Sequence, residues 1–241
     1  MSRLRLLAPG LALLLGASST TALAGARPYA LVQSTETLPQ GGLELENWFG
    51  ASRPPGSPGA WEWWVGPVVG LSEHLETSVF AVMGQPSADP AALTLSQVRL
   101  HLSWLLADRG DWPVDVRLRL ELSQPVSDDS YGIWLWVMVT REWAHFRVTA
   151  NLASFTEIAK ADGTPNQYID FGLGASVPLP QGFSLGAECF GQKDLKEAET
   201  FASVGPSLAW ARGRLWFAAT VGLGLGSSSP NRGRLVVGVT L

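Results

Sequence analysis

Apolar and polar residues alternate with a period of two over most of the chain. In residues 114–123, Val114, Val116, Leu118, Leu120 and Leu122 alternate with Asp115, Arg117, Arg119, Glu121 and Ser123. Successive side chains of a strand point to opposite faces, so the pattern places apolar groups on one face and polar groups on the other. The alternation recurs near residues 98–104 and 146–152. It predicts β-strands that each carry one apolar and one polar face.

Twelve such segments follow one another, and each is about the length that a tilted strand needs to cross a bilayer, ~9 to 11 residues. Connections after the odd-numbered strands are long and polar, and those after the even-numbered strands are mostly short. This rhythm predicts an all-β fold, a transmembrane antiparallel up-and-down β-barrel with short periplasmic turns and longer extracellular loops. The expected strands are 42–51, 60–71, 75–84, 93–106, 113–124, 131–141, 144–154, 167–178, 182–191, 200–210, 213–225 and 233–241.

Aromatic residues on the apolar face favour the membrane interpretation. Trp61, Trp63 and Tyr131 fall near loop ends of the expected strands, while Trp104 and Trp210 fall near turn ends. Amphipathic rings settle at the two membrane interfaces in this way. The alternative is a secreted soluble barrel or sandwich in which the apolar faces form the core.

The amino terminus has the features of an export signal. Arg3 and Arg5 precede an apolar run, residues 6–15, which is too short to span a bilayer as a helix of about 20 residues. A small-x-small cleavage pattern follows at residues 22–24. The expected organisation is a signal peptide at 1–24, a periplasmic N-terminal segment at 25–41 and an outer-membrane β-barrel at 42–241.

Charge and composition narrow the set of partners. The formal net charge is −4, from 17 Lys plus Arg against 21 Asp plus Glu, so no basic face for nucleic acid is expected. The single Cys189 has no partner for an internal disulfide and falls on the apolar face of an expected strand, as a small hydrophobic residue does. We therefore expect a bacterial outer-membrane location, with outer-membrane lipid and lipopolysaccharide against the apolar face.

If the apolar face meets lipid, the opposite face lines the lumen. Two interpretations are open: a transverse electric field across a narrow channel for a polar solute, or acid–base pairs that fill a small barrel. The expected lumen-lining residues are Glu44, Glu46, Glu62, Glu76, Arg99, His101, Arg117, Arg119, Glu121, Arg147, Asn151, Glu188, Arg214 and Arg234.

Aromatic residues also occur on the inward face. They would form either a track for hydrophobic or aromatic solutes or simple packing, and packing is the stronger interpretation on the strand at 131–141, where both faces are bulky. The expected aromatic lumen residues are Trp48, Trp64, Trp134, Trp136 and Trp216, together with Phe80 and Phe190.

Signals for an enzyme are weak. The three histidines, His74, His101 and His145, fall in turns or in the lumen, away from the extracellular rim where a barrel hydrolase would need a Ser–His pair. The sequence has no P-loop, no HExxH and no zinc-type Cys/His spacing. No catalytic residue, metal or cofactor is expected.

Two stretches resemble known outer-membrane proteins. Residues 35–46, TETLPQGGLELE, resemble the opening of outer-membrane transporter barrels grouped with phenol-degradation pathways, and residues 69–77 are similar to a short hairpin of those and related barrels. The resemblance implies uptake of small hydrophobic compounds. The terminal residues 237–241 resemble the strand that the barrel-assembly machinery recognises, with Leu241 in place of the usual Phe or Trp.

These features predict an outer-membrane channel or passive transporter for small solutes, with hydrophobic or aromatic compounds as candidates. The alternative is a closed structural or surface-interaction barrel with a plugged lumen, in which the extracellular loops carry recognition.

Overall fold

The computed structural model describes residues 26–85, 93–127, 129–158 and 165–241, so the expected signal peptide lies outside the described residues. Within these ranges no helix is long and apolar enough to cross a bilayer. The strands are β1 (Leu43–Arg53), β2 (Ala60–Gly70), β3 (Leu75–Gly84), β4 (Thr94–Leu105), β5 (Asp115–Pro125), β6 (Tyr131–Trp143), β7 (Phe146–Ile158), β8 (Asn166–Pro178), β9 (Phe183–Asp194), β10 (Thr200–Arg212), β11 (Leu215–Gly224) and β12 (Asn231–Thr240), with one 3₁₀ turn at Pro180–Gly182.

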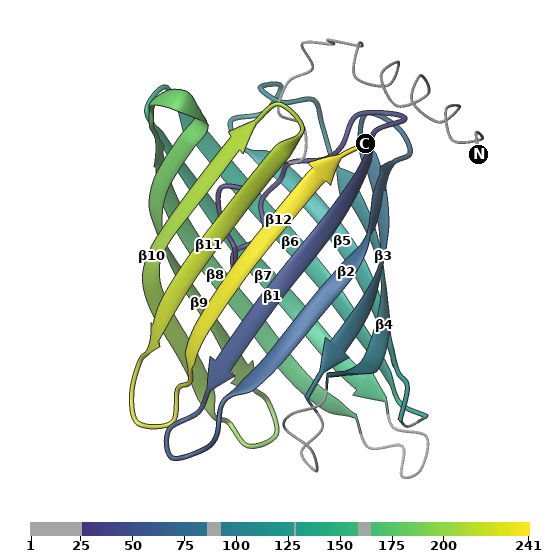
Figure 1. Ribbon diagram of the computed structural model, residues 1–241, viewed down its shortest axis with the longest axis vertical. Helices are drawn as coiled ribbons and strands as arrows, with labels where there is room; N and C mark the ends of the chain where they lie inside the picture. The colour runs from purple at the N-terminus through teal and green to yellow at the C-terminus, as the bar shows by residue number, and fades with distance from the viewer. Residues whose placement is uncertain (1–25, 86–92, 128, 159–164) are drawn as a thin grey trace, which may run out of the picture.

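The strands form one closed antiparallel barrel. Each strand pairs with its neighbours in the chain, and β1 also pairs with β12, from Glu44 opposite Thr240 to Arg53 opposite Asn231 (Figure 1). The predicted twelve-stranded up-and-down barrel is confirmed. Closure leaves no strand edge unpaired, which is the condition for a sheet whose outer face meets hydrocarbon.

The two ends of the barrel differ. We call the end that holds the C-terminus and the connections β2–β3, β4–β5, β6–β7, β8–β9 and β10–β11 the turn side, and the opposite end the loop side (Figure 1). The β10–β11 turn is the two-residue pair Gly213-Arg214, where Gly213 has φ +63°, a left-handed conformation that glycine adopts without steric cost.

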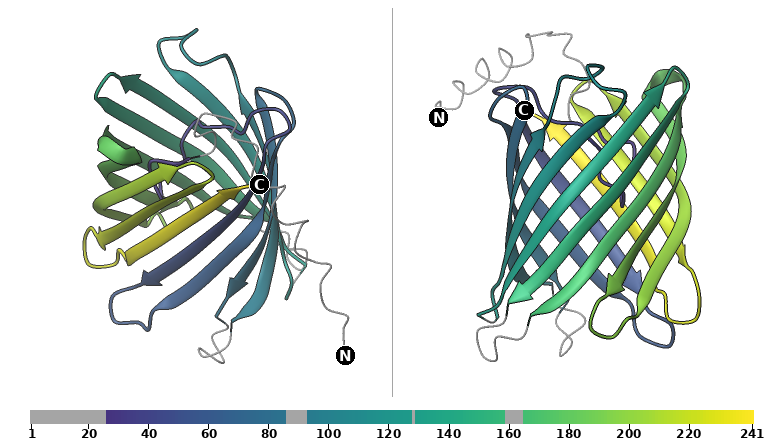
Figure 2. Two further views of the ribbon diagram at one scale, coloured as in Figure 1. Left: turned by 45° about the horizontal axis from the view of Figure 1, so that its top comes forward. Right: turned by 180° about the vertical axis from the view of Figure 1, so that it is seen from behind.

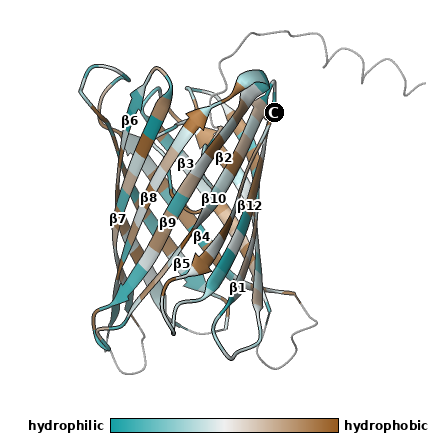
Figure 3. Cartoon of the chain, turned by 90° about the vertical axis from the view of Figure 1, so that its left-hand side faces the viewer, coloured by the Kyte–Doolittle hydropathy of each residue, from teal (hydrophilic) through white to brown (hydrophobic). Residues whose placement is uncertain are grey.

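The outer surface is apolar and the inner wall is polar. On β5, Leu120 is 37% exposed, whereas its neighbours Arg119 and Glu121 are each 3% exposed. Hydropathy alternates along the strands accordingly (Figure 3). The residues that the alternation assigns to the outer and inner faces therefore lie on those faces in the structure.

The N-terminal segment occupies the turn-side half of the barrel interior. Residues 25–41 are expected from the sequence to be a periplasmic lead into the barrel, but the described residues from Ala26 onward enter the barrel, and Tyr29 to Thr35 are all buried. The segment enters and leaves at the turn side and continues into β1 (Figure 2). We call residues 27–38 the plug.

Candidate functional site

The inner wall gathers nearly all of the predicted lumen residues. Glu62, Arg99, Arg147 and Arg234 are partly buried there. Arg214 is the exception, because it lies exposed in the β10–β11 turn rather than on β11, which begins one residue later. Those that are fully buried are Glu44, Glu46, Glu76, His101, Arg117, Arg119, Glu121, Asn151 and Glu188.

One carboxylate holds the tip of the plug. The carboxylate of Glu188 on β9 accepts hydrogen bonds from three consecutive backbone N–H groups, those of Ala30 at 2.9 Å and of Leu31 and Val32 at 2.7 Å. The hydroxyl of Thr220 on β11 also donates to it. Three consecutive backbone donors that would otherwise be unpaired in the interior are thus satisfied by one side chain.

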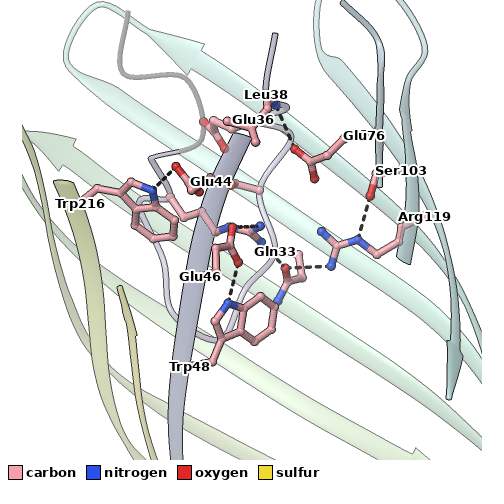
Figure 4. A network of polar contacts seen from close by, with 12 residues as sticks. Gln33, Glu36, Leu38, Glu44, Glu46, Trp48, Glu76, Ser103, Arg119 and Trp216 are labelled. Atoms are coloured by element: carbon pink, nitrogen blue, oxygen red, sulfur yellow. Dashed lines mark hydrogen bonds and ion pairs between the residues drawn. The ribbon is translucent and has the colours of Figure 1, made fainter. Parts of the chain in front are cut away.

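Gln33 continues this attachment on β7, which only β8 separates from β9. Its N–H donates to Oδ1 of Asn151 at 2.6 Å, and Nδ2 of Asn151 donates to the Gln33 carbonyl at 2.6 Å. Its side-chain oxygen accepts hydrogen bonds from Arg27 at 3.0 Å and from Arg119 at 3.1 Å (Figure 4). Asn151 therefore binds the plug much as a neighbouring strand would.

Charged pairs close the turn side. Arg27 contacts Glu46 at 2.6 Å, and Arg147 contacts Glu36 at 2.6 Å. Arg117 donates both to the Glu36 carbonyl and to the carboxylate of Glu76. Two of these pairs use a plug residue as one partner, so the predicted pairing of inner-wall charges is only part of the network.

Glu36 is ionised inside this network. Burial opposes its ionisation, but the guanidinium groups of Arg147 and Arg109, the latter 3.9 Å away, outweigh burial and hold the pKa of the Glu36 carboxyl below its usual value. The plug therefore carries a negative charge that the turn-side arginines bind.

Aromatic residues pack beside the plug. Trp216 donates through Nε1 to Glu44 at 2.8 Å, and Trp48 donates to Glu46 at 2.6 Å (Figure 4). The guanidinium of Arg27 lies 5.3 Å from the ring centroid of Trp48. The ring of Tyr29 lies against Gly174, where a Cβ would be only 2.9 Å from the ring, so any larger residue there would displace the ring.

A cavity of about 480 Å³ fills the loop-side half of the interior. We call it the chamber. Leu31 and Gln33 of the plug tip line it, together with inner-wall residues on the loop-side halves of the strands. Its aromatic lining residues are Trp48, Trp61, Trp64, Trp134, Trp136 and Phe190, and its charged ones are Glu62, Arg99, Arg119, Glu121, Asp170, Arg232 and Arg234.

A row of stacked rings crosses the chamber wall. The guanidinium of Arg99 lies 4.2 Å from the ring centroid of Trp64 and 4.5 Å from that of Trp134, and it pairs with Glu121. Trp64 stacks on Trp48 at 5.1 Å. Stacking and ion pairing fix Arg99 in place, since guanidinium planes lie well on aromatic faces.

Several residues of the site were not predicted from the sequence. Arg27 and Gln33 belong to a segment that was expected outside the barrel, and Arg232 precedes the expected start of the last strand. The apolar run Tyr29 to Val32, within a stretch expected to lie in water, is the one sequence signal that indicates burial of the plug.

No catalytic constellation was predicted, and the histidines lie as follows. His101 is buried beside Glu121 at 3.5 Å, and His74 lies 3.0 Å from Asp108 in the turns. In the part of the chain that the structure describes, no group of three or more His, Cys, Asp or Glu side chains is arranged to hold a metal ion.

A closed twelve-stranded antiparallel barrel with an apolar outer face and a polar interior has the fold of outer-membrane porins. A KdgM porin in complex with disordered oligogalacturonate has a TM-score of 0.58 at 8% identity, covering 82% of this chain and 99% of the porin. The NanC porin has a TM-score of 0.58 at 10% identity, covering 82% and 100%. The translocator domain of autotransporter NalP from Neisseria meningitidis has a TM-score of 0.50 at 13% identity, covering 82% and 88%. These likenesses concern the fold, and no family model or curated protein matches the sequence.

Proposed function

We propose that the protein is a channel for small solutes in the bacterial outer membrane. The observation that carries this proposal is the chamber, a cavity of about 480 Å³ inside a closed barrel whose outer face is apolar. The volume lies within the roughly 300–1,000 Å³ of small-molecule sites. The porin fold of the structural neighbours supports the same function.

Passage through this channel requires the plug to move. The chamber ends on Leu31 and Gln33, and from these residues to the turn-side end the plug fills the barrel. A solute that enters from the loop side therefore stops at the plug tip until the plug shifts or leaves the barrel.

Hydrophobic or aromatic solutes suit the chamber. Trp48, Trp64, Trp134 and Trp136 line it, and a water-filled general pore has no need of so many rings. The resemblance to transporter barrels grouped with phenol-degradation pathways is in keeping with such solutes and is part of the proposal.

A second candidate is a permanently closed barrel with a structural or surface-interaction role, in which the loops carry recognition. The attachment of the plug favours it, because Glu188 and Asn151 alone satisfy four backbone N–H groups of residues 30–33. The two candidates differ in whether the plug moves.

A reversible cross-link tests this difference. A Cβ built on Gly172 lies 3.3 Å from Cγ2 of Val32 in the plug, so thiols at the two positions are within reach of a disulfide. The variant Val32→Cys/Gly172→Cys, in a Cys189→Ser background, is reconstituted into planar bilayers. We expect no single-channel steps while the cross-link is oxidised and voltage-dependent steps after reduction.

A reduced protein as silent as the oxidised one would contradict the channel and favour the closed barrel. An oxidised protein that conducts would keep the channel but contradict the requirement that the plug moves. Val32→Cys alone, oxidised and reduced in the same way, controls for effects of the reagents.

The surroundings of the barrel are part of the proposal. Exposed rings near both ends of the outer face, such as Tyr131 on the loop side and Trp104 on the turn side, support contact with lipid headgroups and lipopolysaccharide. The closing strand β12 is the segment that we expect the barrel-assembly machinery to recognise.

A further inference from the structure

The chamber holds more positive charge than its own carboxylates balance. Four arginines line it, against three carboxylates. Each carboxylate already has a partner on the wall: Glu121 pairs with Arg99, Glu62 accepts from Arg234 at 3.0 Å, and Asp170 accepts from Gln192 at 2.9 Å. One positive charge is in excess.

That excess charge is best assigned to Arg232. Its guanidinium lies 5.4 Å from the ring centroid of Phe190, and among the described residues it makes neither an ion pair nor a hydrogen bond. Arg119, by contrast, donates to Ser103 and to Gln33 of the plug, both at 3.1 Å. Arg232 is therefore the chamber arginine that can bind an added anion without losing a partner.

One buried indole N–H group also lacks an acceptor. Trp136 is 9% exposed and lines the chamber, and within the described ranges its Nε1 has no hydrogen-bond partner. Nε of Arg99 is likewise unpaired. A buried donor left unsatisfied is costly, so these groups favour a ligand that brings acceptor oxygens.

The rest of the chamber selects the body of that ligand. Leu31, Val82, Phe190 and Trp136 present apolar surface, and the outer faces of Trp64 and Trp134 are already stacked on Trp48 and Phe155. Ring edges carry partial positive charge and contact the negative face of another ring, and a guanidinium stacks on an aromatic plane. A flat aromatic body meets both kinds of contact.

We propose that the chamber binds a small aromatic carboxylate, with the carboxylate on Arg232 and the unpaired indole N–H of Trp136, and with the ring against the apolar wall. This rests on the proposed function only in that the ligand enters from the loop side. A neutral aromatic solute offers Arg232 no direct ion pair, and a saturated carboxylate has no π face for the ring edges.

Isothermal titration of the purified full chain in detergent micelles tests the proposal with benzoate as the probe. Benzyl alcohol removes the charge and cyclohexanecarboxylate removes the aromatic face. We expect benzoate to bind about tenfold or more tightly than benzyl alcohol, as a charge-assisted contact predicts. We expect it to bind a few-fold more tightly than cyclohexanecarboxylate, the scale of a ring–ring contact.

Variants locate the site. Arg232→Gln should weaken benzoate binding about tenfold and leave the binding of benzyl alcohol unchanged. The control Arg53→Gln removes the same charge from an exposed position at the loop end of β1, outside the chamber, and should leave the binding of both ligands unchanged. Trp136→Phe keeps the ring and removes the N–H, and should weaken benzoate several-fold. If Arg232→Gln does not fold, the Trp136→Phe variant tests the site in its place.

The proposal is overturned if benzoate binds no better than either control ligand, or if Arg232→Gln or Trp136→Phe in a folded barrel leaves benzoate binding unchanged. Binding is measured without any conductance. A protein that binds benzoate but never opens loses the channel and keeps the site, and a conducting protein that does not bind benzoate keeps the channel and loses the site.

Discussion

Replacing Glu188 with Gln should undock the plug while leaving the barrel closed. Glu188 accepts the N–H groups of residues 30–32, and hydrogen bonds to a charged acceptor contribute roughly 1.5–3 kcal/mol each. The three share one carboxylate and are not additive, and Gln keeps one oxygen as an acceptor. We therefore expect plug docking to weaken by about 2 kcal/mol, which at about 1.4 kcal/mol per decade is roughly a thirtyfold larger undocked fraction.

The labelling rate of a buried thiol measures this fraction. Val32 is 1% exposed, so a thiol from Val32→Cys in a Cys189→Ser background reacts with a maleimide only when the plug opens locally. Glu188→Gln should raise the rate roughly thirtyfold. The matched control is Glu157→Gln, whose carboxylate contacts Ser130 and Asn166 near the loop end of β7 rather than the plug, and which should leave the rate unchanged. An unchanged rate in Glu188→Gln, or an equal rise in the control, would refute the role given to Glu188.

Two further predictions concern the outer face and pH. Leu152→Arg, at the centre of β7 and 55% exposed, should lower the free energy of unfolding in lipid vesicles by about 2–4 kcal/mol, whereas Leu223→Arg near the loop end of β11 should cost about 0–1 kcal/mol. Urea titration in vesicles measures both, and equal costs would contradict a bilayer around the outer face. The pKa of Glu36 is lowered by Arg147 and Arg109, so its contribution to plug docking is fully present above the unperturbed pKa of 4.5 and is lost as the pH falls through the lower docked value. Only the thiolate reacts with a maleimide, so the labelling rate is divided at each pH by that of a freely exposed cysteine. This normalised rate should rise in acid, and Glu36→Gln should flatten that rise; an unaltered pH profile in Glu36→Gln would exclude Glu36 as a source.

The barrel wall could be predicted because its rules are local. Period-two alternation assigns each strand residue to one face, and Arg117, Glu121 and Glu188 are accordingly buried on the inner face while Leu120 is exposed. The predictions fail where strand ends were misplaced by two residues. Starting the eleventh strand at 213 brought Arg214 into the predicted lumen, and starting the twelfth at 233 left Arg232 out of it.

The plug could not be predicted in the same way. Residues 26–41 carry no strand or helix period, and their burial depends on partners such as Glu188 and Asn151, more than a hundred residues away in the chain. Glu188 was predicted to face the lumen, but nothing in its own strand indicates that its carboxylate binds backbone N–H groups. The same holds for Glu76, which accepts from the backbone of Leu38 at 2.9 Å.

The way in which the plug is held is compatible with the proposed movement of the plug. It adds no strand to the sheet, so the twelve-stranded hydrogen-bond ladder is complete without it. The wall that it covers is rich in charged groups, among them Glu46, Glu76, Glu188, Arg117 and Arg119, all of which water can solvate once the plug departs. Water would not stabilise an exposed apolar wall, so a plug that covered such a wall would stay docked. A polar wall exchanges plug contacts for water contacts at a smaller net free energy, since hydrogen bonds to water replace those to the plug. A plug that moves must dock specifically, and the barrel must remain stable when the plug is undocked.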